Sequence, residues 1–149
     1  MDSNILTVLI LCSKIEKKEI DMDLLELLKK RYSVRKFENK KVEKEKLDSI
    51  LEASRVAPTA CNFQPQRILV LNTEASLEKL KKCTPYHFHA PLALIVCYDK
   101  TTSWKRKDGD DMGEVDAAIV TTQMMLETEN IGLGTTWVGY FDKEELIKE

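Results

Sequence analysis

The stretch MGEVDAAIVTTQMMLETENIGLGTTWVGYFD, residues 112–142, joins the longest helical pattern of the sequence to a strand pattern. Apolar residues recur in it at intervals of three and four, which predicts a helix over residues 112–132 that ends at Gly132. The β-branched and aromatic run 135–141 predicts a strand directly afterwards. One wide stripe of the helix carries Val115, Ala118, Ile119, Thr122, Met125 and Leu126. A long helix that returns into a strand predicts helices packed on a sheet.

The rest of the chain repeats these two kinds of pattern. Helical spacing predicts helices at residues 22–31, 43–56 and 74–83, with Asp23 as the cap of the first. Asp142 is expected to cap a last helix that runs to residue 149. Apolar runs predict strands at 67–72 and 91–99. Helices and strands mix without a tandem repeat, which predicts an α+β three-layer sandwich whose central sheet, antiparallel or mixed, is flanked by helices.

The two ends of the chain carry separate predictions. The apolar run from Ile5 to Cys12 is too short to span a bilayer, and no convincing cleavage site follows it. Residues 1–21 are interpreted either as an N-terminal extension with a minor strand of its own or as an upstream artefact, and residues 22–149 as the domain. The last helix stops about two turns in, which predicts that a C-terminal part of the fold is missing.

Composition narrows the classes of function. The chain of 149 residues has 23 basic and 25 acidic residues, a balance that argues against nucleic acid as a partner and makes any anion site local. Its four cysteines form no CxxC pair and it has two histidines, so the spacing of a zinc site is absent. We expect reduced thiols, a cytoplasmic location, no metal and no membrane partner.

The segment RYSVRKF, residues 31–37, carries two cations and a hydroxyl at alternate positions. If it is extended, Arg31, Ser33 and Arg35 point the same way. Guanidinium groups bind phosphate oxygens with paired hydrogen bonds, so the segment suits an anion. The alternative is a solvated charged edge.

Two further segments suit a flat ligand. In APTACNFQPQ, residues 57–66, the amides of Asn62 and Gln64 can read the edge of a heterocycle, and Thr59 adds a hydroxyl. Gly139 lies near the end of the predicted strand, where a missing side chain lets a ligand approach the backbone. The alternatives are a polar turn and a weak strand. No GxGxxG or GxxxxGK[ST] motif occurs, so a Rossmann or P-loop site is not expected.

These three segments, in this order, resemble the flavin-dependent nitroreductase family over about residues 22–149. RYSVRKF matches the family pattern R-[RHY]-S-x-R-x-F, and APTACNFQPQ matches A-P-[ST]-x-x-N-x-Q-P-[WQ]. GLGTTWVGYFD, residues 132–142, matches G-[LI]-G-[ST]-x-W-[IV]-G-x-F-[DS]. The sequence departs from the family after residue 149, where members usually continue with a further strand.

The resemblance implies an FMN site shared by two copies of the chain. One subunit would hold the phosphate and ribityl end and the N5 and O4 edge of the ring, and the second would contact the isoalloxazine. The implied residues are Arg31, Tyr32, Ser33, Arg35, Gly139 and Tyr140 of one subunit, with Pro58, Thr59, Asn62 and Gln64 of the other. The long helix would form the interface of this homodimer.

The resemblance also implies an activity. The implied protein is an oxidoreductase that would pass hydride from NADH or NADPH through FMN to a nitroaromatic, quinone or similar small molecule. No protein residue is expected to be catalytic, because the flavin N5 carries the chemistry. The alternative is a flavin-binding or regulatory remnant without turnover, since the C-terminal strand is absent.

Overall fold

The computed structural model describes residues 3–13 and 23–149. In chain order its elements are β1 (Ser3–Ser13), α1 (Leu24–Lys30), α2 (Lys44–Arg55), the 3₁₀ turn η1 (Ala60–Asn62), β2 (Gln66–Leu71), α3 (Glu74–Cys83), β3 (Leu92–Asp99), α4 (Gly113–Asn130), β4 (Leu133–Val138) and α5 (Lys143–Lys148). The four strands of the described part form one sheet in the order β2-β3-β1-β4, and every neighbouring pair is antiparallel.

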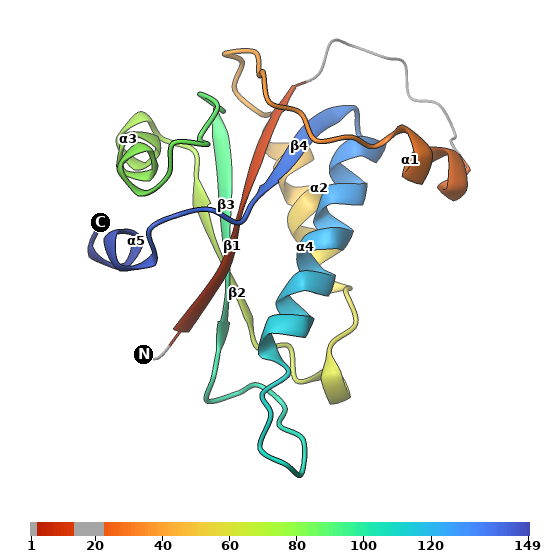
Figure 1. Cartoon of the computed structure of the whole chain (residues 1–149). Coiled ribbons are helices and arrows are strands. Elements are labelled where there is room, and N and C mark those ends of the chain that lie inside the picture. The colour runs from red at the N-terminus through yellow and green to blue at the C-terminus, as the bar shows by residue number, and fades with distance from the viewer. Residues whose placement is uncertain (1–2, 14–22) are drawn as a thin grey trace.

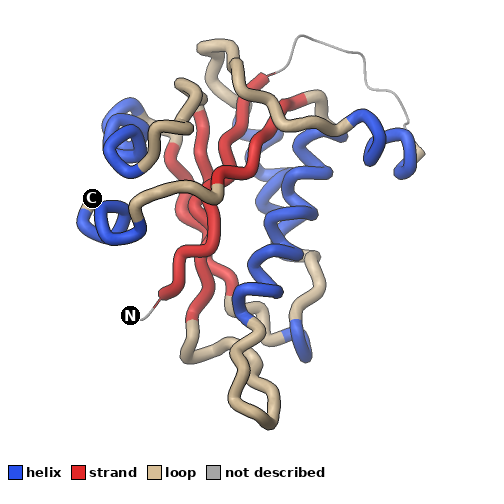
Figure 2. Tube along the Cα trace, viewed as in Figure 1, coloured by secondary structure: helices blue, strands red, loops and turns tan. Residues whose placement is uncertain are grey.

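Helices cover both faces of this sheet. Figures 1 and 2 show α2 and α4 on one side of the strands and α3 and α5 on the other. The predicted α+β sandwich with a central sheet between helices is therefore confirmed. In the residues that the structure describes, no helix is both long and apolar enough to cross a membrane.

The centre of the core is the strand β1. Leu9 and Leu11 join the cluster beneath α2 and α4, while Val8 and Ile10 join the cluster beneath α3 and α5, and all four are fully buried. The neighbouring strand β3 divides in the same way, with Leu94 in the first cluster and Ile95 in the second. A strand that is buried on both faces carries a continuous apolar run instead of an alternating one.

This position of β1 differs from the minor strand that the sequence predicts within residues 1–21. The segment Ser3–Ser13 lies in the interior of the sheet, paired with β3 on one side and β4 on the other. Its uniform apolar run gives no alternation from which a core face could be read, so pattern alone could not show its importance. The rest of residues 1–21 lies outside the described residues, and the division of the chain at residue 21 stays a prediction.

The helix α4 turns one face to the sheet and another away from it. Ala117, Val120 and Met124 are fully buried against the first core cluster. At its start, Gly113 lies under the ring of Tyr98 so closely that a Cβ there would come within 2.0 Å of the ring. The helix is therefore fixed tightly against β3 at its N-terminus.

Two local expectations need correction. Asp23 occupies the position before α1, but its side chain makes no capping hydrogen bond, whereas the predicted Asp142 cap is present and accepts from the Glu145 amide at 2.9 Å. The strand predicted over 135–141 covers Leu133–Val138 instead. Its pairing with β1 begins directly after the turn at Gly132, and the residues beyond Val138 leave the sheet toward α5.

Candidate functional site

The segment 31–37 lies along the outer edge of β4. The Val34 amide donates to the Thr135 carbonyl at 2.8 Å, and Ser33 forms a parallel bridge with Thr135. A Cβ on Gly134 would lie 2.7 Å from a Val34 methyl carbon, so the approach of the segment depends on this glycine. The segment is thus attached to the sheet edge, and it is not a free charged loop.

Among the described residues, the cations of this segment have no carboxylate partners. Across residues 3–13 and 23–149, no ion pair involves Arg31 or Arg35, although the Arg35 guanidinium donates to the Ser33 carbonyl at 3.3 Å. Each of the other arginines forms an ion pair with a carboxylate: Arg55 with Glu52 at 2.5 Å, Arg67 with Asp99 at 3.6 Å, and Arg106 with Asp110. The positive charge of the segment is therefore left available for an anion.

A loop that the sequence patterns did not single out as a binding element, residues 84–90, faces this segment. Together they line a cavity of about 370 Å³, whose members are Arg35, Lys36, Phe37, Pro85, His87, Phe88 and His89. Phe88 and His89 lie in the left-handed region, with φ of 47° and 52°, which is unusual for residues other than glycine. Cations on the walls beside two phenylalanine rings suit a flat, anionic or polarised ligand.

His87 is held as a neutral ring in this loop. Its Nδ1 accepts from the His89 amide at 3.1 Å, which leaves the proton of the neutral ring on Nε2. Partial burial lowers the pKa of His87, and the charges of His89 and Lys81 lower it further, against an opposing effect of Glu78. His87 therefore adds a hydrogen-bond donor to the cavity near neutral pH without adding a charge.

The predicted contacts Gly139 and Tyr140 follow the end of β4 and lie next to the same loop. The Tyr140 carbonyl accepts from the Thr84 hydroxyl at 2.7 Å, and its ring meets the Tyr86 ring edge-on at 5.7 Å between centroids. The Tyr140 side chain is 71% exposed. No atom lies within 4 Å of the place where a Gly139 side chain would begin, so the space beside this glycine is open.

The second predicted segment is held in an uncommon backbone conformation. Cys61, Asn62 and Gln64 have φ of 50°, 56° and 48°. The Gln64 amide donates to the Thr59 hydroxyl at 3.0 Å, and the Gln64 side chain donates to Asn62 Oδ1 at 3.2 Å. Pro58, Asn62 and Gln64 are nevertheless exposed to solvent.

The structure separates this segment from the other two. The Ala60 amide donates to Asp116, in the first turn of α4, whereas the segment 31–37 lies beside β4, which begins after the other end of α4 (Figure 1). The helix has 18 residues, so its ends are about 27 Å apart at the rise of an α-helix. Residues 58–64 therefore lie toward one end of α4 and the segment 31–37 toward the other.

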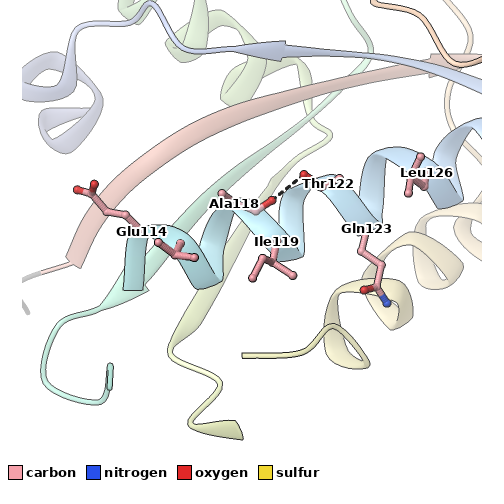
Figure 3. A pocket seen from close by; sticks show the side chains of 7 residues that line it. Glu114, Ala118, Ile119, Thr122, Gln123 and Leu126 are labelled. Atoms are coloured by element: carbon pink, nitrogen blue, oxygen red, sulfur yellow. Dashed lines mark hydrogen bonds between the residues drawn. The ribbon is translucent and has the colours of Figure 1, made fainter. Parts of the chain in front are cut away.

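The outer face of α4 forms a shallow apolar groove. Figure 3 shows the side chains that line it, and the groove has a volume of about 550 Å³. Val115 is 48% exposed and Ile119 is 38% exposed, although both belong to the stripe that the sequence marks as apolar. Nearby, α1 exposes Leu24, Leu25 and Leu28. Exposed apolar surface of this kind marks interaction sites.

The comparisons with known proteins decide the family. The family model described as "Nitroreductase family" matches residues 28–84 and 81–149. A protein of Methanothermobacter thermautotrophicus, provisionally named NADH dehydrogenase/NAD(P)H nitroreductase, is 32% identical over 137 residues, which are 90% of this chain and 70% of the relative. The chain belongs to the nitroreductase family.

Solved structures agree with this assignment. A nitroreductase family protein from Clostridium difficile 630 is 43% identical and has a TM-score of 0.83, over 85% of this chain and 74% of that one. A crystal structure from Desulfovibrio desulfuricans, determined in complex with FMN, is 25% identical and has a TM-score of 0.69, over 80% of this chain and 70% of that one. The nitroreductase fold of this chain is therefore established, and a structural relative binds FMN.

In this nitroreductase family chain, the three predicted segments do not all lie together. Residues 35–37 line a cavity with the loop 84–90, Tyr140 contacts the same loop, and residues 58–64 lie apart at the start of α4. The loop was missed because its sequence, TPYHFHA, has no periodicity. No group of three metal-binding side chains occurs in the described part of the chain.

Proposed function

We propose that this chain binds FMN between two copies of itself. We further propose that it transfers hydride from NADH or NADPH, through the flavin, to a nitroaromatic, quinone or similar small acceptor. The family assignment and the NAD(P)H nitroreductase name of a relative support an oxidoreductase. The FMN complex of a structural relative supports the cofactor.

The observation that carries the proposal is the contrast among the arginines. Within residues 3–13 and 23–149, carboxylates neutralise Arg55, Arg67 and Arg106, while none pairs with Arg31 or Arg35. A guanidinium that no carboxylate neutralises, two residues from a serine, suits a phosphate, which accepts paired hydrogen bonds from it. Arg31, Ser33 and Arg35 would hold the phosphate and ribityl end, with Tyr32 beside them.

The separation of the second segment supports a site made by two chains. Pro58, Thr59, Asn62 and Gln64 lie toward the opposite end of α4 from the segment 31–37 in the same chain. Their exposed amides can reach a flavin ring only if it belongs to a second copy. Asn62 and Gln64 would then offer donors and acceptors to the polar edge of that ring.

The apolar face of α4 supports the same arrangement. Val115, Ile119 and the leucines of α1 lie on a surface that this chain alone leaves exposed. A second copy of the same face would remove it from water, and self-complementary contacts of this kind are usual for homodimers. We therefore propose a homodimer through α4.

When bound, FMN supplies the two-electron chemistry, so the protein needs no acid or base of its own. The chain would bind and orient it. Arg35 would lie toward the pyrimidine side, where a cation favours negative charge. Gly139 and the Tyr140 backbone would face the N5 and O4 edge, and the open space at Gly139 leaves room for a flat ring.

The substitution Gly139→Ala tests this placement of the ring. Its methyl group meets no atom within 4 Å in the chain, and Gly139 is not among the residues with positive φ, so the melting temperature should barely change. If a ring lies there, the methyl group should weaken FMN binding about tenfold, the effect of losing about 1.4 kcal/mol. Fluorescence titration of FMN measures the effect. Unchanged FMN affinity in Gly139→Ala would show that the ring is elsewhere.

The function itself is tested by titration and turnover. We expect the purified chain to quench the fluorescence of added FMN saturably, and the complex to oxidise NADH or NADPH when menadione or a nitrofuran is supplied. A chain that binds no FMN contradicts the proposal. A chain that binds FMN but turns over neither acceptor supports the alternative of a flavin-binding protein without this activity.

A further inference from the structure

Asp116 is a buried carboxylate whose structural purpose is not explained by the core. It is 2% exposed, in the first turn of α4, between the fully buried Ala117 and the exposed Val115. One oxygen, Oδ1, accepts from the Ala60 amide at 2.8 Å. The other, Oδ2, is buried and has no hydrogen-bond partner in the described chain. Burying a carboxylate with an unsatisfied oxygen is costly, so we expect Asp116 to have a specific role.

The hydrogen-bond partner of Asp116, the Ala60 amide, belongs to the predicted flavin-contacting loop, residues 58–64. Ala60 is the first residue of η1, and an amide at the start of a helical turn has no partner within that turn. The carboxylate therefore satisfies a donor that the loop cannot satisfy itself. Among the hydrogen bonds described for residues 58–64, the others join residues no more than nine positions apart in sequence.

The loop needs an external support because its backbone is unusual. Three of its residues, Cys61, Asn62 and Gln64, occupy the left-handed region without being glycine. Such conformations persist only where the surroundings hold them. The position of Asp116 is itself fixed, since its amide donates to Met112 at 3.0 Å and Gly113 is packed under Tyr98.

We infer that Asp116 is a positioning residue: it holds residues 58–64 in the conformation that presents Asn62 and Gln64 to the flavin of the second subunit. Through it the loop is tied to α4, the helix proposed to form the dimer interface. Docking of two α4 helices would thus also place the two loops. The flavin part of this inference rests on the proposed function, whereas the holding of the loop does not.

Two substitutions at Asp116 and one control test the inference. Asp116→Asn keeps an oxygen that can accept from Ala60, while Asp116→Ala removes it. Thr121→Val is the control, because Thr121 is fully buried in the same helix and its hydroxyl donates to the Ala117 carbonyl of that helix at 2.7 Å. We expect Asp116→Ala to raise the Kd for FMN about tenfold, with Asp116→Asn within about threefold of the unmodified chain and Thr121→Val unchanged.

Hydrogen exchange tests whether Asp116 holds the loop, independently of flavin binding. In Asp116→Ala, the amides of residues 58–64 should exchange faster than in the unmodified chain, while the amides of α4 keep their protection. This should hold with and without FMN, and Asp116→Asn should keep the protection of the unmodified chain. Unaltered protection of this loop in Asp116→Ala would overturn the inference. If protection falls but the unmodified chain binds no FMN, the positioning role stands and the proposed function fails. An equal loss of FMN affinity in Thr121→Val would show that Asp116 acts only through the general stability of the fold.

Discussion

Replacement of Arg35 by alanine is expected to weaken FMN binding roughly 10- to 100-fold, the effect of losing a hydrogen bond to a charged group. Arg35 is exposed and has no carboxylate partner in the described residues, so its removal should cost the fold little. A fluorescence titration at fixed ionic strength measures the change, because contacts between charges weaken as salt rises.

Arg106→Ala is the matched control for this change. Arg106 is also exposed, but it lies in the loop 100–112 and is paired with Asp108 and Asp110. Exposed pairs of this kind contribute little to stability, so both variants should melt near the temperature of the unmodified chain. Equal losses of FMN affinity in the two variants would mean that the anion site does not lie at residues 31–37.

The substitution Ile119→Asp is expected to convert the dimer to a monomer and to abolish FMN binding in the same step. Ile119 lies in the middle of the apolar groove of α4, and it is exposed in the single chain. A carboxylate there would face its own copy across the proposed two-fold interface, where burying unpaired charge is strongly unfavourable. Light scattering gives the mass, and circular dichroism shows whether the separated chains keep their helices.

Ile147→Asp provides the control for the new charge. Ile147 is also exposed on a helix, at 65%, but α5 lies on the opposite face of the sheet. This variant should remain a dimer that binds FMN. If Ile119→Asp stays dimeric, or if it becomes monomeric and still binds FMN with the original affinity, the shared site is refuted.

The sequence allowed the fold to be predicted where the patterns were strong. The helix over 112–132 and the strand after it follow from spacing, a terminal glycine and β-branched residues, and α4 and β4 lie there. The sequence could not show that β1 lies in the interior of the sheet, because Val8 to Leu11 are apolar at every position and give no periodicity. Its place depends on pairing with β3 and β4, which are far away in the sequence.

The residues proposed for the site could be chosen from the sequence, but their arrangement in space could not. Arg31, Ser33 and Arg35 could be chosen from their chemistry, and the structure adds that no carboxylate in the described chain neutralises the arginines. The loop 84–90 could not be chosen, since its strained residues Phe88 and His89 leave no mark in the sequence. Nor could the role of Asp116, whose contact with Ala60 joins residues 56 positions apart.

Sedimentation velocity, recorded both in the ultraviolet and at the visible absorption of the flavin, tests the central claim most directly. For a chain of 17.1 kDa mixed with less than one equivalent of FMN, we expect all bound flavin to sediment with a species of twice that mass. Bound flavin that sediments with the single chain would contradict a site built from two copies.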